Sequence, residues 1–174
     1  MSTRCNIIVK SGKSTVYLYR HSDGYPAETG ADLLAKVQTA YGPPDAHRSI
    51  EGAADHFVRA IFAEHYEQQS YETSPKAVYE LTTDLHGDIE HCYQVEFAEM
   101  FAAGPVSIRH AARPANWHES GHEVEDWARG RRYSLQQFAE LVNAERRDMN
   151  ARLAKLRTTS KHYADATDYP MVTA

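Results

Sequence analysis

The sequence predicts an α+β domain: an antiparallel sheet of about four to five strands, built from two hairpins, with helices packed on one face and a long C-terminal helix. Two observations lead to this class. Strand-like segments occur in two groups, each with two runs of β-forming residues around a turn. Helical stripes of apolar residues follow each group, and this order of strands, helices, strands and helix is typical of α+β folds.

The first group predicts a hairpin at the N-terminal end of the chain. Residues 4–10 and 15–20 are rich in β-forming residues and flank a short Ser-Gly-Lys-Ser turn. Side chains alternate along a strand, so Tyr17, Tyr19 and His21 are expected on one face of the second strand. The other face of that strand is apolar and is expected to meet the core.

Two helices are expected after this hairpin. Residues 29–41 form a short amphipathic segment, which Gly42-Pro43-Pro44 ends. Residues 49–62 carry apolar side chains at three- and four-residue spacing, which predicts a helix with a wide core-facing stripe.

A second hairpin is predicted in the middle of the chain. Residues 77–85 and 89–97 read as strands joined through His86-Gly87-Asp88, and the second strand alternates apolar and polar side chains. Residues 106–110 are expected to add a fifth strand. Residues 111–132 are polar and are expected to be irregular or only briefly helical.

The last element is a long helix at about residues 135–157. Ser134 and Gln137 fit a capping box, and Tyr133 can pack against Phe138 at the same end. We therefore expect one α+β domain over residues 1–158, followed by a loose tail at 159–174.

The apolar stripe of this helix continues to Met149, Leu153 and Leu156, farther than a small domain is expected to cover. A homodimer through the C-terminal helix would cover the stripe. The alternative is a helix that lies fully across its own sheet.

The composition excludes several classes of protein. Of 174 residues, 42% are hydrophobic and 25% are charged, which excludes collagen-like, low-complexity and disulfide-framework chains. No run approaches the roughly 18 apolar residues of a membrane span. The net charge of −5 makes extended nucleic acid an unfavourable partner. No secretory signal is recognised at the start, and Cys5 and Cys92 are expected as reduced thiols, so we expect a cytoplasmic protein in the host cell.

Two tripeptides, His21-Ser22-Asp23 and His86-Gly87-Asp88, follow predicted strands and can converge at one rim of the sheet. With the nearby aromatic and basic side chains they form a candidate ligand site. Its members are Tyr17, Tyr19, Arg20, His21, Asp23, Tyr25, His86 and Asp88. Rings could stack on a base while a guanidinium holds phosphate. The alternatives are plain turns with a cross-strand aromatic ladder, or a divalent cation bound by imidazole and carboxylate.

A second motif, His118-Glu119-Ser120-Gly121-His122, fits the HExxH pattern of zinc hydrolases. On a helix His118 and His122 would bind zinc and Glu119 would activate water. The residues before it are not an apolar run and Gly121 weakens a helix, so a polar loop is the competing interpretation. We expect no cofactor, with zinc as the alternative.

The runs at residues 3–10 (TRCNIIVK), 17–26 (YLYRHSDGYP) and 86–90 (HGDIE) together resemble a group of small proteins of unassigned function carried by tailed phages and prophages. The resemblance covers roughly residues 3–97 and brings no catalytic or ligand-binding residue with it. It implies an accessory protein of a phage or mobile element, directed at a host defence system. We therefore expect inhibition by stoichiometric binding of a defence protein or a nucleotide-derived signal, with a zinc-dependent hydrolase as the alternative.

Overall fold

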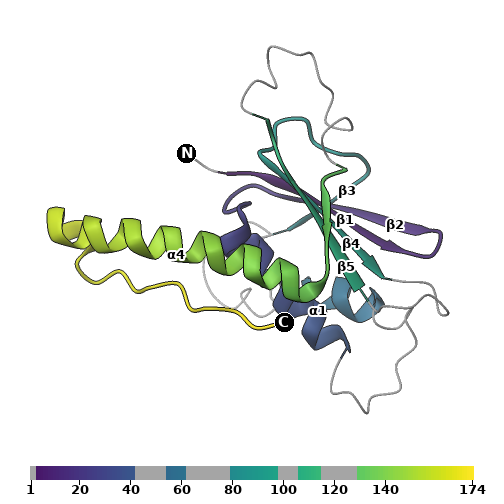
Figure 1. Cartoon of the computed structure of the whole chain (residues 1–174). Helices are drawn as coiled ribbons and strands as arrows, with labels where there is room; N and C mark the ends of the chain where they lie inside the picture. Colours follow the sequence, from purple (N-terminus) through teal and green to yellow (C-terminus); the bar gives the residue numbers. More distant parts are fainter. Residues whose placement is uncertain (1–2, 42–53, 62–78, 98–105, 115–128) are drawn as a thin grey trace, which may run out of the picture.

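A single mixed sheet organises the computed structural model, which describes residues 3–41, 54–61, 79–97, 106–114 and 129–174 (Figure 1). The strand order is β3-β2-β1-β4-β5-β6. The strand bounds are β1 Cys5–Ser11, β2 Ser14–Arg20, β3 Glu80–Thr82, β4 His91–Phe97, β5 Val106–Ala112 and β6 Arg131–Tyr133. Helices pack on one face of the sheet, so the predicted α+β class is confirmed with slightly more strands than expected.

The first hairpin forms as predicted. β1 and β2 pair antiparallel from Cys5–Arg20 to Ser11–Ser14. Gly12 takes a positive φ of 54° in the turn between them, a conformation that favours glycine.

The second predicted hairpin is wrong. β3 pairs with β2, with Leu81 opposite Leu18. β4 pairs parallel with β1, on the side of β1 that faces away from β2. These pairings make β3 and β4 run in the same direction, so they cannot be the two arms of one hairpin. Residues 83–90 instead cross the face of the sheet that the helices leave open. The physical reason lies in β1, whose first five residues are all buried and therefore need strands on both sides.

The far edge of the sheet is made by β5 and β6. The predicted strand at 106–110 is confirmed as β5, which pairs antiparallel with β4. β6 pairs with β5 and begins within the segment, residues 111–132, that was expected to be irregular. Its three residues are too short a run to give a strand pattern of their own.

The core lies between the sheet and the helices on one face. Pro26–Gly30 forms a π-helical turn that leads into α1, Ala31–Tyr41, and residues 54–61 are helical as well. Both predicted helices are therefore present in the parts that are described. The large fully buried side chains of this layer are Ile7, Leu18, Leu33, Leu34, Val37, Phe57, Tyr93, Val95, Ile108, Phe138 and Val142.

α4, Leu135–Thr159, matches the long helix expected at 135–157. The Ser134 side chain accepts from the Gln137 backbone N–H and the Gln137 side chain accepts from Ser134, as a capping box requires. The rings of Tyr133 and Phe138 lie 6.0 Å apart, which confirms the predicted contact. Phe138 and Val142 anchor the first half of α4 on the core, and its second half projects away from the sheet (Figure 1).

The tail after α4 follows a defined path along the helix, whereas the sequence predicted a loose tail. Beyond a short 3-10 turn at Lys161–Tyr163, the chain runs back along α4 and ends near α1 (Figure 1). Asn143 and Asn150 of the helix hydrogen-bond to its backbone. Sequence periodicity missed this segment because an extended chain held by side-chain amides has no apolar repeat.

Candidate functional site

The candidate site lies where β2 ends, on the face of the sheet that the crossover of residues 83–90 covers. Tyr17 and Tyr19 point to this face, and Leu18 and Arg20 point to the helices, because side chains alternate along β2. Tyr19 packs there with Ile8 of β1 and with Ile89 at the end of the crossover.

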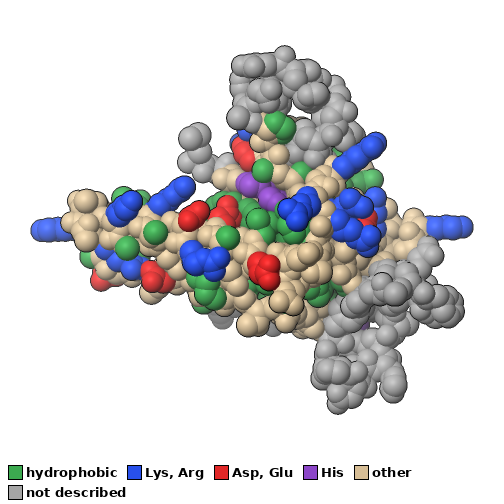
Figure 2. Space-filling model, viewed as in Figure 1, with side chains coloured by type: hydrophobic (Ala, Val, Ile, Leu, Met, Phe, Trp, Pro, Cys, Tyr) green, Lys and Arg blue, Asp and Glu red, His purple; other side chains and the backbone are tan. Residues whose placement is uncertain are grey.

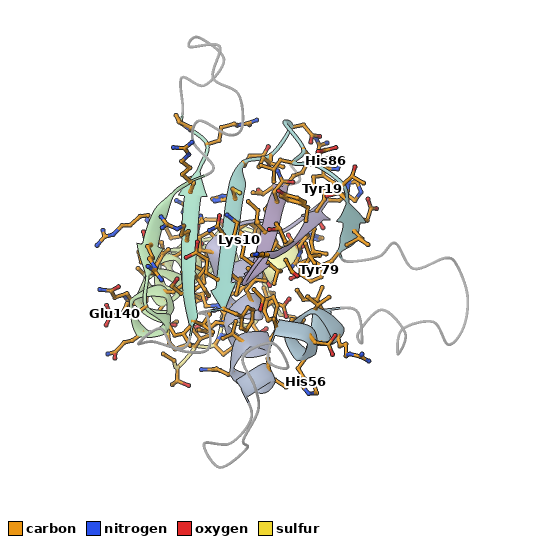
Figure 3. The ribbon with its side chains drawn as sticks, turned by 90° about the vertical axis from the view of Figure 1, so that its right-hand side faces the viewer. Lys10, Tyr19, His56, Tyr79, His86 and Glu140 are labelled. Atoms are coloured by element: carbon orange, nitrogen blue, oxygen red, sulfur yellow. The ribbon has the colours of Figure 1, made fainter. Side chains whose placement is uncertain are left out.

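An aromatic stack joins the two tripeptides that the sequence singles out. The Tyr19 ring lies parallel to the His86 imidazole, with centroids 4.0 Å apart and 16° between the planes. The His21 ring meets Tyr19 edge-on at 4.6 Å. Figure 3 shows Tyr19 and His86 side by side at this end of the sheet. The structure therefore brings His21 and His86 together at one rim, as predicted.

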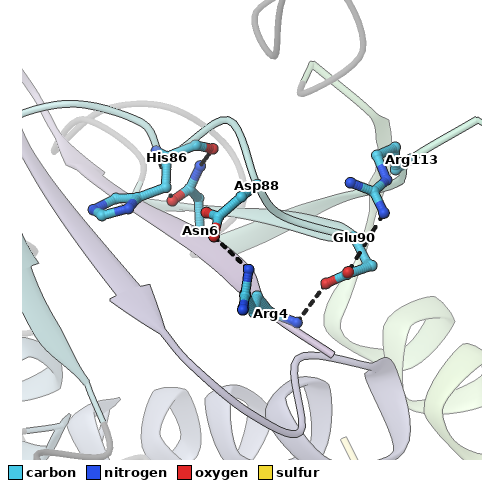
Figure 4. A network of polar contacts seen from close by, with 6 residues as sticks. All are labelled: Arg4, Asn6, His86, Asp88, Glu90 and Arg113. Atoms are coloured by element: carbon cyan, nitrogen blue, oxygen red, sulfur yellow. Dashed lines mark hydrogen bonds and ion pairs between the residues drawn. The ribbon is translucent and has the colours of Figure 1, made fainter. Parts of the chain in front are cut away.

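His86 is positioned through its backbone by Asn6 of β1. The Asn6 amide donates to the His86 carbonyl at 2.9 Å, and the His86 N–H donates to the Asn6 Oδ1 at 3.2 Å (Figure 4). Asn6 is only 1% exposed, so this pair of hydrogen bonds satisfies an amide that would otherwise be buried without partners. The crossover is held to the centre of the sheet by this contact.

Charged side chains fix the remainder of the crossover (Figure 4). Arg4 makes an ion pair of 2.5 Å with Asp88, and its backbone N–H donates to Glu90 at 2.6 Å. Glu90 also meets Arg113 at 3.4 Å, just beyond the end of β5. Asp88 is thus engaged in an ion pair with Arg4 at the rim.

The outer border of the rim is formed by β3, an edge strand among the described residues. Glu80 of β3 meets the His21 imidazole at 2.9 Å. The next residue, Leu81, leaves 67% of its surface exposed. Leu81 lies opposite Leu18 and therefore points to the helix face of β3, whereas Glu80 lies opposite Tyr19 and points to the rim with His21.

Arg20 does not join the site, and its predicted role in holding phosphate is not supported by its position. Its side chain turns to the helix face, where it donates to the Ser22 carbonyl at 2.7 Å and to the Tyr79 hydroxyl at 3.1 Å. Tyr79 donates in turn to Asp32 of α1, which also pairs with Lys36. Side chains alternate along β2, so the register that places Tyr19 at the rim places Arg20 on the opposite face.

Asp23 and Tyr25 also lie away from the aromatic stack. Asp23 occupies the turn after β2 with a positive φ of 57°. Tyr25 contacts Asp23 at 3.5 Å and is hydrogen-bonded to Tyr169 of the tail, and burial raises its pKa above the ordinary value. Gly24 between them has no room for a side chain, since a Cβ there would lie 2.7 Å from the Arg4 carbonyl carbon. These residues shape the turn and receive the tail.

The predicted stacking platform for a base is already occupied by the protein's own rings. Tyr19 is 2% exposed and one of its faces is covered by His86. Burial raises the pKa of its hydroxyl. Tyr17 is half-buried on the same face. The arrangement is a packed aromatic cluster whose outer members, His21 and His86, border the surface.

His91 and His110 form a second pair of histidines, on the neighbouring strands β4 and β5. The Nδ1 of His91 lies 3.0 Å from Nε2 of His110, and the two rings are stacked. Burial lowers the pKa of each to about 4. The pairing depends on the β4–β5 register, which no local sequence pattern gives. Both thiols are buried, and burial raises the pKa of Cys5 and of Cys92 to about 12, which disfavours a thiolate nucleophile.

The HExxH residues His118, Glu119 and His122 lie outside the described residues. Within the described part of the chain, no group of three or more His, Cys, Asp or Glu side chains could hold a metal ion. No described helix is both long and apolar enough to cross a membrane.

Comparison with known proteins adds no relative. No protein-family model matches the chain, and no curated protein or solved structure matches it either.

Proposed function

We propose that this protein is an accessory protein of a phage or mobile element that binds a host defence protein stoichiometrically and inhibits it. The setting comes from the motifs at residues 3–10, 17–26 and 86–90, which resemble small phage and prophage proteins. The contact surface comes from the rim that two of these motifs build.

The observation that carries the proposal is the exposure of Leu81 on the edge strand that borders this rim. Leu81 is 67% exposed on the helix face of the short strand β3, and the contact between His21 and Glu80 lies on the other face of the same strand. A partner that pairs with this edge would therefore meet an apolar side chain on one face and polar side chains on the other, a combination that protein–protein contacts use. An edge strand also offers unpaired backbone groups to a partner.

A protein partner suits this surface better than a nucleotide-derived signal. A nucleotide would need an open ring face and a guanidinium, whereas Tyr19 is stacked on His86 and Arg20 is held by Ser22 and Tyr79 on the other face. The net charge of −5 also disfavours an anionic ligand. Capture of a nucleotide-derived signal remains the competing target class, and it predicts a different co-purifying molecule.

The test is co-purification of the tagged full chain from defence-bearing cells, with mass spectrometry of both proteins and small molecules. We expect one host protein that is retained by wild type and by Ser14→Lys, an exposed control at the far end of β2, and lost with Leu81→Lys. A co-purifying nucleotide in place of a protein, or a partner that binds Leu81→Lys as well as wild type, would contradict the proposal.

We propose in addition that the projecting half of α4 forms a homodimer. Met149 and Leu153 are half-buried and Leu156 is 38% exposed. Figure 2 shows hydrophobic side chains among acidic and basic ones along this half of the helix. A stripe of this kind, bordered by both signs of charge, suits pairing with a second copy of the same helix.

A further inference from the structure

The C-terminal tail is held against α4 by side chains that contact its backbone. Asn150 donates to the Tyr169 carbonyl at 3.0 Å and accepts from the Tyr169 N–H at 2.8 Å. Asn143 makes the same pair of hydrogen bonds with Val172, both at 2.8 Å. Each asparagine therefore binds both backbone groups of one tail residue.

The spacing of these contacts matches helix to extended chain. Asn143 and Asn150 are seven residues apart, which is about 10.5 Å along an α-helix. Val172 and Tyr169 are three residues apart, which is about 10 Å in an extended chain. Arg157, seven residues beyond Asn150, pairs with the side chain of Asp168 at 2.7 Å. The two asparagines of α4 thus present matched backbone contacts to an extended segment that lies antiparallel to the helix.

Additional backbone contacts lie between and beyond the asparagines. The Arg146 guanidinium donates to the Pro170 carbonyl and also to the Ala27 carbonyl at 2.8 Å, and its side chain is 8% exposed. From α1, Gln38 donates to the Thr173 carbonyl at 2.7 Å. These contacts are made to the backbone of the tail and do not depend on most of its side chains.

Two tail side chains supply the selectivity. Tyr169 lies 5.9 Å below the Arg146 guanidinium and is hydrogen-bonded to Tyr25, and Val172 packs against the core. Pro170 between them donates no backbone hydrogen bond and favours an extended chain. The other side chains from Thr167 onwards are exposed.

We propose that the surface formed by α4, α1 and Tyr25 is a binding site for an extended peptide of the type Tyr-Pro-x-Val, and that the chain's own tail occupies it in cis as a competitor. The partner is an extended protein segment with an aromatic residue, a proline and, three residues after the aromatic, a small aliphatic residue. This site shares no residue with Leu81 or with the rim beside β3, so it holds whether or not the proposal for that surface does.

The test uses the full chain and a labelled peptide of residues 166–174, with fluorescence anisotropy as the readout. Tyr169→Ser/Val172→Ser in the chain weakens the cis tail, so this variant should bind the peptide roughly tenfold or more tightly than wild type, which must first release its own tail. A peptide with the same two serine substitutions should bind neither protein.

A matched pair of variants on α4 checks where the peptide binds. In the weakened-tail background, Asn143→Ala/Asn150→Ala should abolish peptide binding. Glu140→Ala/Arg147→Ala, an exposed pair on α4 with the same seven-residue spacing, should leave it unchanged.

Three results would overturn the proposal. The weakened-tail chain could bind the peptide no better than wild type, or the asparagine variant could retain binding. The third is loss of helical circular dichroism and cooperative melting in the weakened-tail chain. That loss would make the tail a fixed part of the core and not a displaceable occupant.

Discussion

His91 and His110 face the helix layer from neighbouring strands and share a hydrogen bond of 3.0 Å. Burial lowers the pKa of each to about 4, and for His110 the charge of His91 acts in the same direction, whereas Glu90 opposes the shift at His91. The unfolded chain binds these protons near pH 6.5. Between pH 6.5 and 4 the unfolded chain therefore binds protons that the folded chain does not bind. The stability of the fold falls as the pH drops through this window and is at its full value only above it.

We expect the free energy of unfolding to fall by roughly 2–3 kcal/mol for each histidine of this pair as the pH drops from about 6.5 to about 4. Urea unfolding at a series of pH values measures it. His91→Gln/His110→Gln keeps a hydrogen-bonding pair that does not titrate, and it should flatten this part of the pH dependence. An unchanged slope in the double variant would show that other groups carry it.

At His118, Glu119 and His122 the prediction concerns metal content. A zinc site of this motif needs both histidines on one face of a packed helix, and Gly121 and the polar residues before the motif disfavour that helix. We expect far less than one zinc per chain by elemental analysis after expression with added zinc. A near-stoichiometric zinc content that His122→Ala removes would favour the hydrolase instead.

The residues of the rim were partly predictable. A histidine and an aspartate after each of two strands indicated convergence, and His21 and His86 do meet on opposite sides of Tyr19. Arg20 could not be placed correctly without the identity of the buried face, since one step along a strand reverses a side chain. Leu81 gave no signal, because its exposure follows from the edge position of β3.

At the scale of elements, the crossover of residues 83–90 decides the topology. Its Gly87-Asp88 step reads locally as a hairpin turn, but Asn6 holds His86 over β1 and commits the chain to pass over the sheet. Strands, helices and the α4 cap followed from local patterns. The pairing of β1 with β4 did not follow from them, because it depends on the burial of both faces of β1.

Asn6→Ala should lower the stability of the fold by about 1–3 kcal/mol, because it removes two hydrogen bonds from the half-buried backbone of His86 in the crossover. Chemical denaturation measures the loss. Thr83→Ala, an exposed position in the same crossover, is the control and should change stability little. Equal losses in the two variants would mean that the Asn6 contact does not hold the crossover.

At the scale of the whole molecule, the sheet and the first half of α4 form the packed body, and the second half of α4 extends beyond it with the tail alongside (Figure 1). The tail covers one side of this extension and Leu156 remains 38% exposed. The sequence indicated the long stripe correctly, but it could not show that the tail would cover part of it.

Light scattering at micromolar concentration tests the homodimer. The chain mass is 19.7 kDa, so we expect twice this mass for wild type and 19.7 kDa for Leu153→Glu, because a buried glutamate would disrupt the helix pair. A wild-type mass of 19.7 kDa that Leu153→Glu leaves unchanged would rule out the dimer.

The central claim is that the protein works by capture and not by turnover. The most direct measurement is a titration of a defence-bearing cell extract with increasing amounts of the purified chain, following the remaining defence activity over time. We predict that activity falls in proportion to added chain, reaches an end point at a fixed molar ratio, and then stays constant. Continued loss of activity at substoichiometric amounts of the chain would contradict the account and indicate an enzyme.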